Sequence, residues 1–127
     1  MNPPRPLTTA ELIQLGAEAS SPCADCQTLA CPGWESVRGG AELSQLACVG
    51  TLRDAALEDP TVAEFHPAGT RGESADAPIA PGWFPYNRCD VWRCTRCASA
   101  FLRYTEYGGY YNDERIRTLN PALVVVS

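Results

Sequence analysis

The sequence predicts an α+β fold, in which a short N-terminal helix precedes a mainly antiparallel sheet. A helix-start signal followed by an apolar face lies near the N-terminus, and a Gly-Gly pair separates two strand-like runs near the C-terminus. Eleven prolines and ten glycines among 127 residues favour short elements joined by many turns over a helical bundle. We expect a single domain over residues 1–127, because this length is common for one compact core.

The predicted helix lies close to the N-terminus. Residues 1–7 are rich in proline, and we expect them to be extended or frayed. Thr8 followed three residues later by Glu11 is a capping-box pattern. Three apolar residues then begin one face of the helix: Leu12, Ile13 and Leu15. We therefore expect a helix over residues 9–18.

Four segments besides the C-terminal hairpin are predicted to be strands. Residues 45–53 contain the run "VGT", which favours a strand over a helix continuing from Ala41. Residues 61–67, "TVAEFHP", are predicted to form a second short strand, and residues 83–94, "WFPYNRCDVWRC", a third. The apolar residues 122–126 are predicted to form the last strand.

A hairpin is predicted around the Gly-Gly pair at residues 108–109. A two-residue loop of this kind needs positive φ at both glycines. The register that follows gives four pairs on one face, of which two are aromatic or apolar and one is oppositely charged, combinations that stabilise a ladder. These pairs are Tyr107 with Tyr110, Thr105 with Asn112, Arg103 with Glu114, and Phe101 with Ile116. The alternative is a helix over residues 113–119, capped by Asn112.

Seven cysteines are distributed along the chain. No apolar segment near the N-terminus resembles a secretory signal, and no stretch approaches the roughly 18 apolar residues of a membrane span. We therefore expect a cytoplasmic protein without membrane contact, whose cysteines remain thiols or bind a metal. The odd number of cysteines fits this expectation better than a closed set of disulfides.

Two pairs of cysteines have the spacing of metal-binding knuckles, Cys23-x2-Cys26 and Cys94-x2-Cys97. A gap of two residues lets one tight turn direct both sulfurs at a point about 2.3 Å away, the zinc–thiolate distance. Four thiolates complete a closed tetrahedral site, which is typical of structural zinc. The pattern predicts Zn²⁺ bound by these four residues, although iron suits four thiolates as well.

This pattern resembles zinc ribbons, in which two cysteine knuckles carried by β-hairpins share one zinc ion. The resemblance covers only the two knuckles and the strands beside the second one. It implies a four-cysteine zinc site with a structural role. The chain differs from the family in its long spacer, residues 27–93, and in having Gln27 and Ala98 where a glycine usually follows each knuckle.

Other residues near the knuckles are weaker candidates for the site. The less favoured ligands are Cys31, Cys89 and the only histidine, His66. Cys31 or Cys89 could replace one knuckle cysteine as a metal ligand, or both could form a second metal site with His66. Buried packing as a small apolar residue is the simpler interpretation of Cys31, Cys48 and Cys89. Three arginines around the second knuckle are predicted to offset the charge of −2 that zinc with four thiolates carries. These arginines are Arg88, Arg93 and Arg96.

The distribution of charge along the chain indicates which classes of partner are favoured. The net charge is −5 and every basic residue is an arginine. Residues 1–82 contain four arginines and eleven acids, whereas residues 83–127 contain six arginines and four acids. An acidic chain disfavours nucleic-acid binding, because that binding depends on phosphate neutralisation.

The sequence contains no phosphate-binding loop, dinucleotide fingerprint or nucleophile elbow. We therefore expect a non-enzymatic interaction module with another protein as its partner and no catalytic residues. The aromatic run at residues 81–87 is the candidate contact, with burial in the core as its alternative. Two other functions remain open: nucleic-acid association through the arginine- and tyrosine-rich hairpin, and thiol redox chemistry.

Overall fold

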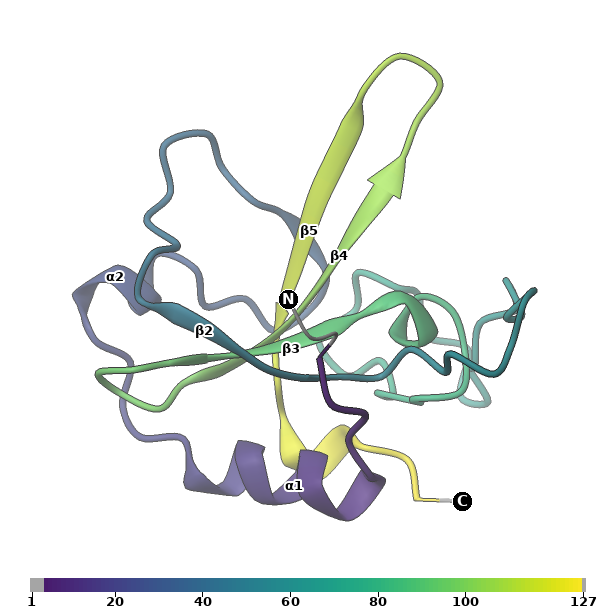
Figure 1. The fold of residues 1–127 in the computed structure, drawn as a ribbon, viewed down its shortest axis with the longest axis horizontal. Coiled ribbons are helices and arrows are strands. Elements are labelled where there is room, and N and C mark those ends of the chain that lie inside the picture. The colour runs from purple at the N-terminus through teal and green to yellow at the C-terminus, as the bar shows by residue number, and fades with distance from the viewer. Residues whose placement is uncertain (1–3, 127) are drawn as a thin grey trace.

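A five-stranded antiparallel sheet forms the centre of the protein, as a computed structural model describing residues 4–126 shows. The strands follow the order β1-β5-β4-β3-β2 (Figure 1). Their bounds are Glu35–Ser36 for β1, Leu46–Thr51 for β2, Asp90–Cys94 for β3, Ala100–Tyr107 for β4 and Asn112–Thr118 for β5. The helices are α1 (Thr9–Glu18) and α2 (Ala24–Gln27), with 3₁₀ turns η1 (Tyr86–Arg88) and η2 (Pro121–Leu123). This arrangement confirms the predicted α+β class.

Helix α1 begins at the predicted capping box. The Thr8 hydroxyl accepts from the backbone N–H of Glu11 at 3.1 Å, and the Glu11 carboxylate accepts from the backbone N–H of Thr8 at 3.0 Å. The helix packs on η2 at Gly16, where a Cβ atom would lie only 2.9 Å from the Pro121 ring. The prediction of a helix over residues 9–18 is therefore confirmed.

Both faces of the sheet are covered by other parts of the chain. On one face, α1 and the long loop before β3 enclose an apolar cluster that includes Leu12, Ile79 and Leu102. On the other face, residues 23–46 cover a second cluster around Phe101 and Ile116. The knuckle cysteines belong to this second cluster. The candidate metal centre is thus placed against one side of the sheet.

The segment before α1 lies beside β2. Of the residues 1–7 that we expect to be extended or frayed, residues 1–3 lie outside the described part of the chain. The Arg5 carbonyl accepts from the backbone N–H of Thr51 at 2.9 Å, and the N–H of Leu7 donates to the Thr51 carbonyl at 3.0 Å. These bonds hold an extended segment along the outer edge of the sheet.

Two predicted strands do not form. Residues 61–67 are irregular, because Phe65 packs against Trp83 with ring centroids 5.5 Å apart and Pro67 begins a turn. Residues 122–126 start within η2, and only Val124 forms a bridge, with Ile79. In both segments β-compatible residues are used to pack a loop rather than to join a ladder.

The strand predicted over residues 83–94 is present only in its second half. The backbone before Asp90 forms η1, in which the N–H of Asn87 donates to the Trp83 carbonyl at 3.0 Å. Tyr86 is buried in this turn, at 4 % exposure, whereas Trp83 is 40 % exposed. The strand predicted over residues 45–53 is confirmed as β2.

The C-terminal hairpin forms, but the predicted register is wrong by two residues. Tyr107 pairs with Asn112, and Arg103 pairs with Ile116. The connection therefore has four residues, and neither Gly108 nor Gly109 has the positive φ that a two-residue loop requires. A shift of two residues keeps every side chain on its predicted face, because the side-chain period of a strand is two. The alternative helix over residues 113–119 is replaced by β5.

Candidate metal centre

Four cysteine side chains converge between α2 and the turn that joins β3 to β4. The sulfurs of Cys23, Cys26, Cys94 and Cys97 all lie within 4.8 Å of one another. The Sγ atoms of Cys23 and Cys94 are 3.9 Å apart, close to the ~3.8 Å expected for two thiolates on one tetrahedral zinc ion. All seven cysteines of the chain are free thiols, so no disulfide competes for these sulfurs.

The first knuckle is part of a short helix. Cys23 is the N-cap of α2, and its carbonyl accepts from the N–H of Gln27 at 2.9 Å. The Cys26 carbonyl accepts from the N–H of Ala30 at 2.9 Å, which turns the chain sharply after the knuckle. This geometry differs from the zinc-ribbon resemblance, in which both knuckles are carried by β-hairpins.

The second knuckle is the turn between β3 and β4, as the resemblance implies. The N–H of Arg96 donates to Cys94 Sγ at 3.3 Å, and the N–H of Ala98 donates to the Cys94 carbonyl at 3.1 Å. Ala98 has φ of 60°, the left-handed conformation that glycine adopts most readily. The alanine at this family glycine position therefore keeps the turn but adopts a strained backbone.

This strain gives a first prediction. Ala98→Val should lower the free energy of unfolding by about 1–3 kcal/mol, because a β-branched residue at positive φ is strongly disfavoured. Ala98→Gly should leave stability unchanged or raise it, since relief of left-handed strain offsets the extra freedom of the unfolded chain. Urea denaturation of both metal-loaded variants measures the difference. A glycine variant less stable than the valine variant would contradict the assigned turn.

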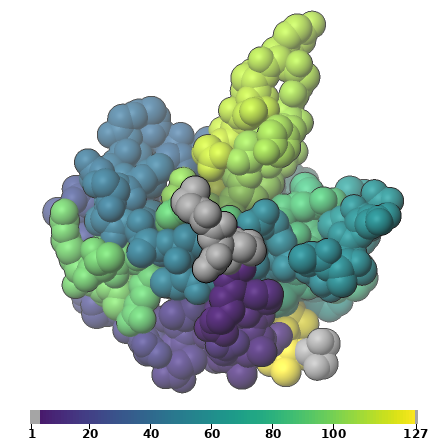
Figure 2. Space-filling model, in the orientation of Figure 1, coloured from purple at the N-terminus to yellow at the C-terminus, as the bar shows by residue number. Residues whose placement is uncertain are grey.

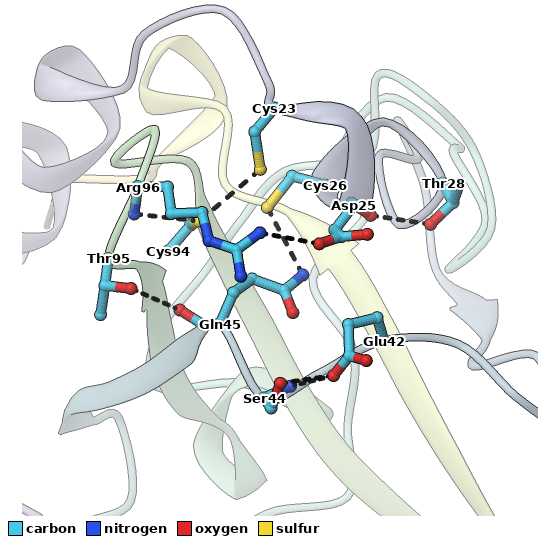
Figure 3. A network of polar contacts seen from close by, with 10 residues as sticks. All are labelled: Cys23, Asp25, Cys26, Thr28, Glu42, Ser44, Gln45, Cys94, Thr95 and Arg96. Atoms are coloured by element: carbon cyan, nitrogen blue, oxygen red, sulfur yellow. Dashed lines mark hydrogen bonds and ion pairs between the residues drawn. The ribbon is translucent and has the colours of Figure 1, made fainter.

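Polar groups from other elements surround the sulfurs. The Gln45 side-chain amide donates toward Cys26 Sγ at 3.8 Å, and Figure 3 shows it pointing into the cluster. The Gln45 carbonyl also accepts from the N–H of Thr95 at 3.0 Å, which joins the start of β2 to the second knuckle. Cys97 Sγ lies 3.1 Å from the Ser99 hydroxyl. These contacts orient the thiolates in the way that outer hydrogen bonds support metal ligands.

The thiols of the metal-free cluster differ in acidity. Burial opposes ionisation of Cys97, but hydrogen bonds from the Ser99 hydroxyl and the Cys23 backbone outweigh it and lower the pKa to about 6. Burial, together with hydrogen bonding to Cys94, raises the pKa of Cys26 well above its usual value. A metal ion needs all four groups as thiolates. We therefore expect metal binding to release protons, with Cys97 as the thiol that is ionised first.

The weaker candidate ligands lie outside this cluster. Cys31 Sγ donates to the Ile116 carbonyl at 3.4 Å, and Cys89 Sγ donates to the Pro85 carbonyl at 3.3 Å. Both thiols are buried, as the packing interpretation predicts, and burial raises the pKa of each. Cys48 is exposed, so that interpretation is wrong for it. Cys48 shares the face of the buried Leu46, two positions earlier in a regular part of the ladder, but lies beyond the residues that cover this face at the knuckles.

His66 is held by hydrogen bonds away from the cysteines. Its Nδ1 lies 2.7 Å from the Thr70 hydroxyl, and its Nε2 lies 2.9 Å from a Glu64 carboxylate oxygen. Within residues 4–126, no second group of converging histidine, cysteine or carboxylate ligands is found. His66 therefore joins no second cluster in that part of the chain.

The three arginines predicted to offset the thiolate charge have different surroundings. Arg96 Nη1 lies 2.9 Å from an Asp25 carboxylate oxygen, and this ion pair, shown in Figure 3, connects the two knuckles. Arg93 lies 3.3 Å from a Glu18 carboxylate oxygen. Arg88 donates to the Pro60 carbonyl at 3.0 Å and lies over the Phe84 ring. The described structure thus places Arg96 next to the cluster and directs Arg88 elsewhere.

Gln45, Ser99 and Asp25 contact the site but were not among the predicted residues. Ser99 follows Cys97 by two positions, so the knuckle itself is a local signal for it. Asp25 lies inside the first knuckle, but its partner is 71 residues away. Gln45 has no local signal, since it reaches the site only through the placement of β2.

Comparisons of the chain with protein-family models, with curated proteins and with solved structures found no match. Among residues 4–126, no helix combines the length and apolar character needed to span a bilayer. The function must therefore be inferred from the cysteine cluster and its surroundings.

Proposed function

We propose that Cys23, Cys26, Cys94 and Cys97 bind one Zn²⁺ and that the protein is a non-enzymatic interaction module. The convergence of four sulfurs within 4.8 Å is the observation that carries this proposal. Four protein thiolates complete a tetrahedron, whereas a catalytic zinc keeps one position open for water or substrate. The ion would then join α2 to the β3–β4 turn and stabilise the fold. This role corresponds to that of the zinc in a zinc ribbon.

Zinc is preferred to iron on chemical grounds. The cluster lies in a chain with seven free thiols, which suits a reducing compartment such as the cytoplasm. Zinc has no redox chemistry, so a zinc site remains stable there without electron transfer. A tetrathiolate iron site would absorb visible light, whereas a zinc site is colourless.

The arginines of the hairpin argue against the nucleic-acid alternative. Arg117 is fully buried. Arg115 lies 3.7 Å from an Asp113 carboxylate oxygen. Guanidinium groups engaged within the fold are poorly placed to neutralise phosphates. We therefore favour a protein partner.

Metal and thiol analysis of one preparation tests the proposal. Elemental analysis of the purified protein should give one zinc per chain. Thiol titration under native conditions should leave the four cluster cysteines unreactive, and a chelator should release them. The masked thiols should also stay masked under mild oxidant, which distinguishes structural zinc from a redox protein. A colourless preparation without metal, or with reversible disulfides at these cysteines, would overturn the assignment.

A further inference from the structure

The half of β4 nearest the hairpin tip has a neighbouring strand on only one side. The ladder between β3 and β4 ends at the pair Asp90–Arg103, whereas β4 pairs with β5 as far as Tyr107. Within the described chain, residues 104–107 form no backbone hydrogen bonds outside the hairpin. An unpaired strand edge is a template for a further strand. Figure 2 shows the tip of the hairpin standing clear of the rest of the molecule, and Tyr107 at the end of β4 is 78 % exposed.

The edge is open because the chain before β3 turns away from it. A continuous strand over residues 86–89 would have covered residues 104–107. Instead, this segment forms η1, and the side-chain amide of Asn87 donates to the Thr61 carbonyl at 2.8 Å. The Arg88 guanidinium is likewise bonded to the Pro60 carbonyl. The long loop therefore holds η1 in a turn that contacts β4 without pairing with it, and the edge at residues 104–107 stays open in the folded structure.

A groove of about 680 Å³ follows this open edge. Residues 104–107 form one side of it, and aromatic and charged residues line the rest. The aromatic and basic residues are Phe84, Trp92, Arg53, Arg88 and Arg103, and the acidic ones are Asp90, Glu106 and Glu114, of which Asp90 lies next to Arg53 and Glu114 next to Arg103. Backbone groups along one wall and side-chain surface along the other are the features of a site that adds a strand.

Two of the three arginines in the groove have donor capacity to spare. Arg53 is already paired, at 2.9 Å, with Asp90. Arg88 makes no ion pair with any described residue, and the closest approach of Arg103 to a carboxylate is 3.8 Å, to Glu114. The Nε atoms of Arg88 and Arg103 are both buried without a hydrogen-bond partner. A carboxylate entering the groove would give these two guanidinium groups a charged partner.

We propose that the open edge of β4 binds an extended segment of a partner protein as an added strand, with an acidic side chain of that segment held by Arg88 and Arg103. This inference rests on the proposed function as an interaction module and supplies its surface. Main-chain hydrogen bonds to residues 104–107 give affinity, and the arginines select an acidic residue. A second copy of this chain would bring Arg103 as well as Glu106 of its own β4 to the groove, so a partner segment that carries the acid without the arginine fits better.

The test uses a pool of short synthetic peptides and metal-loaded protein. Each peptide has a fixed central glutamate, with valine, isoleucine, threonine or tyrosine at the other positions, and carries a fluorophore for anisotropy measurements. Members of the pool should bind. Replacing glutamate by glutamine in the tightest binder should weaken binding about tenfold, the value of one charge-assisted hydrogen bond. Two methylated forms of this peptide are compared, one with methyl groups on the odd-numbered backbone nitrogens and one with methyl groups on the even-numbered ones. Only the form whose methylated nitrogens face β4 should fail to bind, because those nitrogens can no longer donate hydrogen bonds to the strand.

Two matched arginine variants locate the binding site. Arg88→Gln should remove the preference for glutamate over glutamine, whereas Arg71→Gln, at an exposed loop position outside the groove, should preserve it. Failure of the whole pool to bind would overturn the proposal. So would equal binding by both methylated forms, displacement of the peptide by a single-stranded oligonucleotide, or self-association of the protein through β4. Zinc content and circular dichroism, recorded on the same samples, show separately whether the metal centre is intact.

Discussion

Removing the metal with a chelator is expected to lower the free energy of unfolding by more than about 5 kcal/mol. Structural zinc sites contribute apparent binding free energies of about 10–16 kcal/mol in small domains, and that energy is available only to the folded chain. We expect less than the full stabilisation of about 10–16 kcal/mol by the metal here. The apolar cluster around Leu12 and Leu102 contains none of the four ligands, so it stabilises the fold independently of the metal. Thermal denaturation of loaded and chelated samples, followed by circular dichroism, measures the difference.

Cysteine variants test whether the effect comes from the four-sulfur cluster. Cys26→Ala removes a fully buried ligand and should abolish the difference between loaded and chelated protein. Cys89→Ala removes an equally buried thiol outside the cluster. It should lower stability by only about 1–2 kcal/mol while preserving the metal dependence. If chelation had the same effect on Cys26→Ala as on the unchanged protein, the metal would have to bind elsewhere.

The features predicted correctly are those that a few neighbouring residues determine. The capping box of α1 needs only Thr8 and Glu11, which are three positions apart. The cysteine knuckles are also local signals, and their shared spacing was sufficient to predict that the two pairs meet. The strand β2 was recognised from its own β-branched run.

The features that were missed depend on distant parts of the chain. Residues 61–67 have strand-like composition, but residues 5–7 already lie along the free edge of β2, and Phe65 packs against Trp83 instead. The hairpin register could not be read from the glycines, because both registers place the same side chains on the same face. Gln45 contacts the cysteine cluster only because β2 and β3 pair, with Leu46 opposite Cys94. Such contacts have no signature in a short window of sequence.

The wrong strand prediction over residues 83–94 also shows why the edge of β4 is open. Had residues 83–94 formed one strand, they would have covered the edge that the proposed partner segment occupies. The same residues supply Phe84 and Arg88 to the groove because they form a turn. Residues 83–94 thus have the sequence pattern of one strand, but their first half forms a turn and leaves the edge of β4 at residues 104–107 unpaired.

Arg117→Met is expected to lower the free energy of unfolding by about 3–5 kcal/mol. Arg117 is 0 % exposed and forms none of the ion pairs found within residues 4–126. Its guanidinium donates to the carbonyls of Pro32 at 3.0 Å and Ala77 at 2.8 Å, and to the Tyr86 hydroxyl. One side chain therefore joins β5 to the loop between α2 and β1, to the long loop before β3 and to η1. Methionine fills a similar volume but leaves the two carbonyls without this donor, whereas the Tyr86 hydroxyl still accepts from Trp34 Nε1 at 3.2 Å.

Arg115→Met is the matched control for Arg117→Met, because it lies on the same strand and the same face two residues earlier. Its side chain is 33 % exposed and forms one long ion pair, so we expect a loss below about 1 kcal/mol. Arg117→Lys should lose almost as much as Arg117→Met, since a single ammonium group cannot reach acceptors that a planar guanidinium spans. Urea denaturation followed by tryptophan fluorescence compares the three variants. Equal small losses at both positions would mean that the carbonyl groups around Arg117 find other donors, and that the loops are held together by apolar packing instead.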